Sequence, residues 1–134
     1  MDVTMAVAAE DVQFVGAETG GHKLNIIGVF DQIVCEGTPC TLDQITVLVG
    51  FSADPTEFGD QRPIQVYLLD PDGTPLSGLQ RTCAIPASPR VGSRSFFHLA
   101  FPFRDITFQG YGPHTFSVKV GKDHKADVPL YISE

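Results

Sequence analysis

The segment Gln44-Ile45-Thr46-Val47-Leu48-Val49-Gly50-Phe51 decides the fold class, because large apolar side chains recur at every second position. Successive side chains of a β-strand point to opposite faces of a sheet, whereas an α-helix would repeat near every 3.6 residues. The segment is therefore predicted to be a strand. One of its faces carries the larger apolar residues, Ile45, Val47, Val49 and Phe51.

The same alternation recurs along the chain, at residues 3–7, 64–68, 97–103, 116–120 and 128–132. Glycine and proline interrupt it at 20–21, 37–39, 71–73, 86–92, 110–113 and 121–123. These residue types are typical of turns, since glycine adopts positive φ and proline cannot continue a ladder. We expect no helix, and we expect strands near 2–15, 22–34, 43–53, 63–70, 75–85, 94–103, 114–121 and 124–132.

This spacing predicts an all-β chain: a single domain, residues 1–134, folded as a two-sheet antiparallel β-sandwich of about eight strands, immunoglobulin-like or jelly-roll-like. The first two strands are longer than the ~5–6 residues typical of globular proteins, so each is expected to bend or change sheet. Gly28 is the predicted bend in the second strand, because the apolar positions change face there, as a bulge at glycine would produce.

The segment from Gly21 to Asp31, with its Gly-His-Lys-Leu-Asn run and Gly-Val-Phe-Asp ending, resembles a family of small bacterial proteins of unknown function. The likeness extends to the Leu-Asp-Pro-Asp-Gly turn at 69–73 and to a closing pair of strands at 114–132. The resemblance implies the fold and leaves activity open, because no catalytic residues come with it.

The composition argues against two classes of partner. A formal charge of −7 repels the phosphates of nucleic acids and of anionic membranes, so neither is an expected partner. No segment approaches the ~20 apolar residues needed to cross a bilayer, and the first residues lack the basic region of a secretion signal. A cytoplasmic location with reduced cysteines is the resulting prediction.

Metals and cofactors are not expected. Cys35 and Cys40 could offer two thiolates to zinc, but a structural zinc site needs four ligands, and Cys83 is predicted to lie toward the opposite end of the sandwich. A loop disulfide or two unreactive thiols explains the first pair better. Calcium in the acidic segment 54–60 is a weaker alternative, and Asp70 to Gly73 is better explained as a tight hairpin.

A run of arginines without acids suggests an anion-binding edge. Residues 73–104 contain four arginines and no Asp or Glu, whereas residues 1–72 contain twelve acids. Guanidinium groups suit carboxylates and phosphates. The candidate residues are Arg81, Arg90, Arg94 and Arg104.

The leading functional hypothesis is a protein-interaction module that self-associates. The outward positions of the strands near 63–70 and 94–103 are apolar, so they would form a contact surface if both strands lay in one sheet. The alternative is that a loop at 102–111 covers them. No catalytic motif is present, and we expect no enzymatic activity. The predicted interface residues are Tyr67, Leu69, Phe96 and His98.

Overall fold

The computed structural model describes residues 1–16 and 22–134, which form strands joined by short turns. These residues contain nine strands and one 3₁₀ helix: β1 (Asp2–Gly16), β2 (His22–Phe30), β3 (Gln32–Val34), β4 (Cys40–Ala53), η1 (Pro55–Glu57), β5 (Gln61–Leu69), β6 (Pro75–Ala84), β7 (Ser95–Phe108), β8 (Gly112–Val120) and β9 (Asp123–Ser133). The predicted all-β class is confirmed. The expected turn at Gly20-Gly21 lies outside the described residues.

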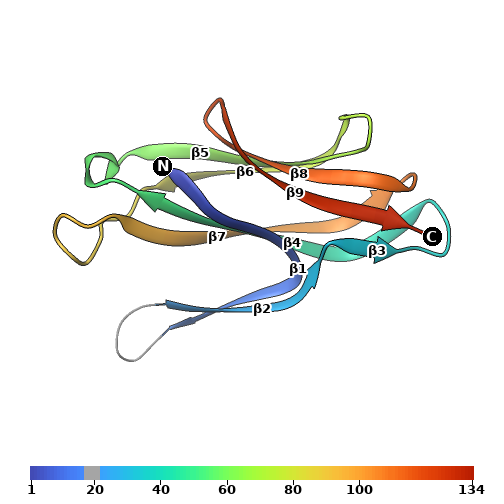
Figure 1. Ribbon diagram of the computed structural model, residues 1–134, viewed down its shortest axis with the longest axis horizontal. Coiled ribbons are helices and arrows are strands. Elements are labelled where there is room, and N and C mark those ends of the chain that lie inside the picture. The colour runs from blue at the N-terminus through green and yellow to red at the C-terminus, as the bar shows by residue number, and fades with distance from the viewer. Residues whose placement is uncertain (17–21) are drawn as a thin grey trace.

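Two sheets face one another across a shared core (Figure 1). Sheet A has the strand order β2-β1-β4-β7, and sheet B has the order β3-β9-β8-β5-β6. Paired strands are antiparallel, apart from β3 and β9, which run parallel. The predicted sandwich is confirmed. It has nine strands instead of eight because the expected strand at 22–34 divides into β2 in sheet A and β3 in sheet B.

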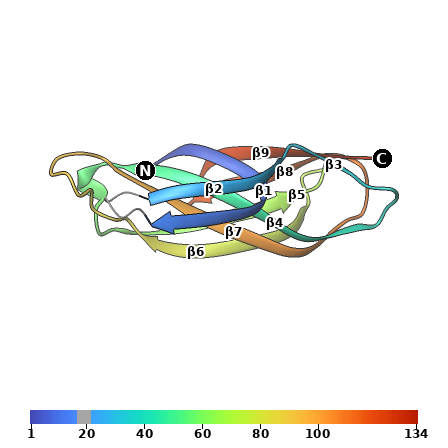
Figure 2. The ribbon, with the colours of Figure 1, turned by 90° about the horizontal axis from the view of Figure 1, so that it is seen from below.

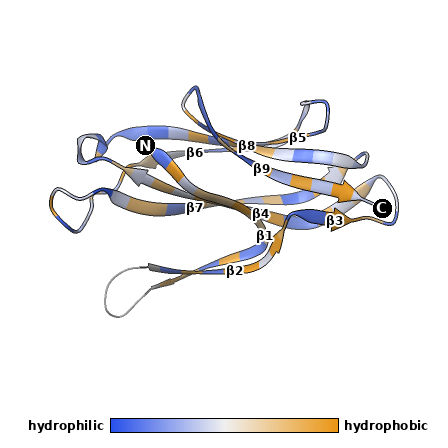
Figure 3. Ribbon diagram, in the orientation of Figure 1, coloured by the Kyte–Doolittle hydropathy of each residue, from blue (hydrophilic) through white to orange (hydrophobic). Residues whose placement is uncertain are grey.

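The core contains most of the alternating residues that the sequence pattern identified. Each buried side chain of this size stabilises the fold by about 1.5–3 kcal/mol relative to exposure. The pattern at 3–7 is wrong, because a bulge between Val3 and Met5 places Met5 and Val7 opposite Gly50 and Leu48, on the face away from the core. Figure 3 shows the alternation along the strands as changes in hydropathy. The core residues from the predicted faces are Ile45, Val47, Val49, Phe51, Ile64, Val66, Leu68, Phe101, Phe103, Phe116, Val118, Val120, Val128, Leu130 and Ile132.

β1 and β2 bend together at Gly28, as predicted, but the expected bulge is absent, because the β1–β2 register continues unchanged from Ala9↔Val29 to Asp11↔Ile27. Gly28 has a φ of +66°, a left-handed conformation that glycine adopts easily. A Cβ added there would also lie 2.8 Å from Cδ of Glu10 on β1. Beyond this point the two strands leave the plane of sheet A. We call the described residues 10–16 and 22–29 the arm, and Figures 1 and 2 show that it lies against the outer side of sheet A.

Two turns test the sequence interpretation. The hairpin at Asp70 to Gly73 is confirmed: Oδ1 of Asp70 accepts hydrogen bonds from the backbone N–H groups of Asp72 and Thr74, and Gly73 has a φ of +83°. The alternative of a covering loop at 102–111 is wrong, because β7 continues to Phe108 and pairs with β4 along this length. β4 in turn starts at Cys40, three residues before its predicted start.

Candidate functional site

The arm covers part of the outer face of sheet A. Thr46 and Leu48 point away from the core, since they alternate with core residues of β4, yet their side chains are buried. Gly50 and Ser52 on the same face are buried as well. The arm lies on this side of the sheet (Figure 2), so β4 is covered by sheet B on one face and by the arm on the other.

An open cleft of about 720 Å³ lies between the arm and the start of β7. Its walls are Phe14 and Leu24 from the arm, Pro86, Ala87 and Pro89 from the segment after β6, and residues 95–98 of β7. All of these residues are apolar except Ser95 and His98. Phe14 and Leu24 are partners in the β1–β2 register, so they lie side by side on one face of the arm.

Local sequence explains how these side chains reach the cleft. Phe96 and His98 occupy alternate positions of β7 and point away from the core, while Phe97 packs against Phe51 with ring centroids 5.3 Å apart. Gly50 makes room beside His98, because a Cβ at Gly50 would lie 3.0 Å from Cδ2 of the imidazole. The result is an apolar surface on which Phe96 is 70% exposed.

The polar groups of the cleft are sparse. Ser95 is 3% exposed, and its hydroxyl has no hydrogen-bond partner within residues 1–16 and 22–134. Desolvation lowers the pKa of His98, which keeps the imidazole neutral at pH 7. Because Ser95 alternates with Phe96 and His98, its hydroxyl lies on the core side of β7. The cleft therefore offers apolar walls and the neutral imidazole of His98.

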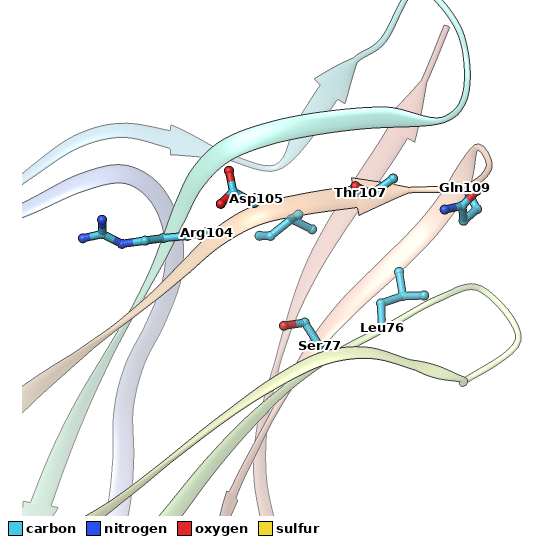
Figure 4. A pocket seen from close by; sticks show the side chains of 7 residues that line it. Leu76, Ser77, Arg104, Asp105, Thr107 and Gln109 are labelled. Carbon is cyan, nitrogen blue, oxygen red and sulfur yellow. The ribbon is translucent and has the colours of Figure 1, made fainter.

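A second, smaller cavity of about 310 Å³ lies between β6 and the far end of β7. Leu76 and Ser77 form one side, and residues 104–107 with Gln109 form the other (Figure 4). Asp105 has a φ of +51°, uncommon for a residue with a side chain. The side chain of Arg104 extends away from Leu76 and Ser77 in Figure 4, so the cavity has no converging charged groups.

The model of a known protein family matches residues 6–133, which include both the arm and the cleft. The matching model is described as a family of unknown function, DUF6941. The chain belongs to DUF6941. The resemblance to a family without assigned activity is thereby confirmed. Curated proteins provide no match to this chain.

The DUF6941 domain does not bring the four predicted interface residues together. β5 lies in sheet B and β7 in sheet A, so the assumption that both strands share a sheet is wrong. Tyr67 packs over Gly78, where a Cβ would lie 2.6 Å from the ring, and Nζ of Lys119 lies 6.0 Å from the centroid of the same ring. Leu69 is half-buried on the same sheet, whereas Phe96 and His98 line the cleft.

The four arginines are also separated. Arg81 of β6 donates a hydrogen bond to the carbonyl of Ala100 at 2.9 Å and stacks over Phe101. Arg94 binds Asp2, Asp54 and Ser52. Arg104 lies ten residues from Arg94, about 33 Å along an extended strand. Arg90 lies in the segment between β6 and β7. One small anion could not contact all four.

The candidate metal-binding residues have other partners. Cys35 and Cys40 form a disulfide, which is one of the two alternatives expected for this pair, so the prediction that all cysteines are reduced does not hold. Cys35 follows β3 and Cys40 begins β4, so the bridge links these two strands. In the acidic segment, Glu57 binds the N-terminal ammonium at 2.7 Å and Asp60 binds Arg62 at 3.0 Å. The described residues contain no group of three or more His, Cys, Asp or Glu side chains placed to hold a metal.

Within the described part of the chain, no helix is long and apolar enough to span a bilayer.

The sequence interpretation missed the arm residues of the cleft. Phe14 and Leu24 are apolar positions of two strands that looked like ordinary members of the sandwich. The available signal was the length of these strands together with Gly28, which indicated a bend. Its consequence, an apolar arm outside the core, depends on the direction of the bend.

Proposed function

We propose that this DUF6941 domain is a non-enzymatic protein-interaction module that self-associates by pairing β2 with β2 of a second copy. The observation that carries the proposal is the open edge of sheet A. β2 is nine residues long, and its hydrogen-bonded neighbour among the described strands is β1 alone. An edge of this length offers unpaired backbone groups to another strand.

The side chains of β2 favour this use. Proteins usually protect an edge with charged residues or proline, yet β2 contains one charged residue, Lys23, and no proline. Ile27 is 43% exposed and Val29 61% exposed. None of the arm residues belongs to the described hydrophobic core, and an isolated two-stranded hairpin is at best marginally stable in water. A partner would cover this apolar surface.

Other edges are better protected. β3 is three residues long. β7 contains Pro102, and Arg81 of β6 donates a hydrogen bond to the Ala100 carbonyl of β7. β6 begins with Pro75. The contrast favours β2 as the contact strand.

The charged residues at the two ends of β2 favour a second copy of the chain as the partner and favour one register of the β2–β2 pair. An antiparallel pair of β2 strands centred on Ile27 places Lys23 of one copy opposite Asp31 of the other, and the two-fold axis repeats the contact. The same register sets Leu24 opposite Phe30. A second copy is therefore complementary to this edge although the whole chain carries a formal charge of −7.

Light scattering coupled to size-exclusion chromatography tests the proposal with two matched valines. Val29 on β2 and Val34 on β3 are similarly exposed, at 61% and 68%. We expect the wild type and Val34→Lys to be dimers and Val29→Lys to be a monomer. A wild type that stays monomeric at high concentration, or equal behaviour of the two variants, would contradict the proposal.

A charge exchange tests the register. Lys23→Glu should raise the dissociation constant of the dimer by about fivefold, since each exposed ion pair contributes about 0.2–1 kcal/mol and the dimer has two. Adding Asp31→Lys should restore most of the affinity. Additive weakening in the double variant would exclude this register.

The anion-binding alternative has less support, because its four arginines lie apart and Arg94 already binds two carboxylates. The cytoplasmic location remains a prediction. The Cys35–Cys40 disulfide weighs against it, since disulfides are rare in reducing compartments. Alkylation of the thiols in intact cells before lysis would test it: labelling of all three cysteines supports a reducing location, and labelling of Cys83 alone opposes it.

A further inference from the structure

The cleft adjoins an open edge of sheet A. β7 is the end strand of that sheet, with β4 as its hydrogen-bonded neighbour among the described strands. Backbone groups of a strand point alternately to its two sides. The carbonyl of Ala100 points away from β4, because it accepts a hydrogen bond from Arg81 of sheet B, and Pro102, two residues on, has no N–H to offer on this side. The β4–β7 register is continuous, so the N–H and C=O groups of Phe96 and His98 also face the open side.

This part of the edge is unprotected. Outside the strand ladders, no backbone–backbone hydrogen bond among the described residues involves Phe96 or His98. The protecting features lie further along β7, since Arg81 reaches the carbonyl two residues after His98 and Pro102 follows it. The start of β7 therefore offers unpaired donors and acceptors to an added strand.

An added strand would direct alternate side chains into the cleft. Residues directly opposite one another in an antiparallel pair share a face of the sheet. Residues opposite Phe96 and His98 would both hydrogen-bond to β7 and point into the cleft, because those two side chains line it. The residue between them would lie opposite Phe97, whose ring packs on the core side. Apolar side chains therefore suit the two outer positions, and a small side chain suits the middle one.

The walls of the cleft favour a single uncharged segment. The arm contributes Phe14 and Leu24, and the segment after β6 contributes two prolines and an alanine. These walls beside β7 leave less room for the edge of a second folded domain than for one extended chain. The lining contains no Lys, Arg, Asp or Glu, and desolvation lowers the pKa of His98. A charged side chain would lose its hydration without gaining an opposite charge.

We propose that the edge of β7 beside the cleft binds an extended peptide segment of a partner protein by antiparallel strand addition. The segment has an uncharged apolar–small–apolar sequence. Its two apolar residues form hydrogen bonds with the backbone of Phe96 and His98, and their side chains pack against Phe14 and Leu24. Sheet A then has contact strands at its two opposite edges, β2 for a second copy and β7 for the peptide.

NMR spectroscopy tests the proposal with the uncharged probe peptide acetyl-Thr-Leu-Ala-Leu-Thr-amide. We expect saturable shifts of the amide signals of Phe96 and His98, and slower hydrogen exchange at both, because binding pairs their N–H groups. Absence of saturable shifts, or shifts confined to β2, would overturn the proposal.

Two methylated probes separate hydrogen bonding from apolar contact. In the proposed register the amides of the two leucines point to β7, whereas those of the alanine and the second threonine point away from it. N-methylation of both leucines should therefore weaken binding by about tenfold or more. N-methylation of the alanine and that threonine should weaken it by less than about twofold. Equal weakening would exclude strand addition.

Paired variants of the arm test whether the leucines enter the cleft. Phe14→Ser removes a wall of the cleft, whereas Val15→Ser changes the adjacent residue, which points to the other face of the arm. Affinity for the probe should fall about tenfold in the first variant and change by less than about twofold in the second. Equal losses would place the leucine side chains outside the cleft and contradict the proposal.

Phe96→Pro and Phe96→Ala form a matched pair for the backbone of β7. Both remove the ring, but only proline removes the N–H, and an edge strand tolerates proline where the N–H faces outward, as at Pro102. The proline variant should bind the probe at least about fivefold more weakly than the alanine variant, with the amide shift of His98 as the readout. Equal affinities would show that the peptide does not use this N–H and would overturn the proposal.

Peptide binding at β7 does not depend on self-association through β2. Val29→Lys, designed to separate the copies, should bind the probe with unchanged affinity and with the same shifts at Phe96 and His98. Loss of probe binding in that variant would show that β7 and the arm of one chain do not form the site, and would overturn the proposal. A monomeric wild type that binds the probe at β7 would contradict self-association alone.

Discussion

β4 and β2 are the two neighbours of β1 in sheet A, yet their surroundings are opposite. Nine consecutive residues of β4, from Ile45 to Ala53, are buried, whereas none of the described side chains of β2 is fully buried. Both strands are rich in apolar residues. The difference shows that the pattern of apolar residues predicts a strand and which of its side chains share a face. Whether those side chains are buried in the core or exposed for binding is determined by the elements that cover the strand.

The largest expected effect is on the core beneath β4. Phe51 is 1% exposed and stacks on Phe97, so Phe51→Ala should lower the free energy of unfolding by about 3–5 kcal/mol. Phe14→Ala in the arm should lower it by less than about 1 kcal/mol, because that ring is half exposed. Urea denaturation measures both. Similar losses would mean that the arm contributes to the cooperative core.

The outer face of β4 gives the next effect. Leu48 is fully buried outside the core cluster, so Leu48→Ala should cost about 2–4 kcal/mol if the arm covers it. Leu24→Ala is the control within the arm, with an expected loss below about 1 kcal/mol. If Leu48→Ala costs no more than Leu24→Ala, the arm is not the cover that the structure indicates.

The disulfide is expected to stabilise the two-sheet sandwich and to have no effect on the arm. It closes a short loop between Cys35 and Cys40, and loop-closure entropy predicts a stabilisation of about 2 kcal/mol. Reduction should lower the free energy of unfolding by that amount and leave hydrogen exchange within the arm unchanged. Cys83→Ser provides the control, since Cys83 is a free cysteine. Faster exchange throughout the arm after reduction would show that arm and sandwich unfold together.

The smallest effect concerns Glu57, at the end of the sandwich far from β3. Hydrogen bonding to the N-terminal ammonium lowers the pKa of its carboxyl below 4.5. A carboxyl with a lowered folded-state pKa stabilises the protein above its unfolded pKa, and this contribution is lost as the pH falls through the folded value. Stability should therefore decrease below about pH 4.5, by less than about 1 kcal/mol. Glu57→Gln should remove this part of the pH dependence.

Much of the fold could be predicted because strand alternation is a local property. The buried faces of β4, β5, β8 and β9 and the bend at Gly28 follow directly from the order of residues. The candidate site was predicted only in part: Phe96 and His98 line the cleft, but Tyr67 and Leu69 lie on the other sheet. Alternation gives the face of a residue within its strand and contains no information about which sheet that strand joins.

By itself, the sequence determined which side chains share a face and where the backbone must turn, because both follow from the two-residue period of a strand and from the φ angles open to glycine and proline. Only the tertiary structure decided that β5 and β7 belong to different sheets, and that the bend at Gly28 carries Phe14 and Leu24 to Phe96. Those outcomes depend on pairing and packing between residues far apart in the chain, where the free energy of the whole assembly selects the arrangement.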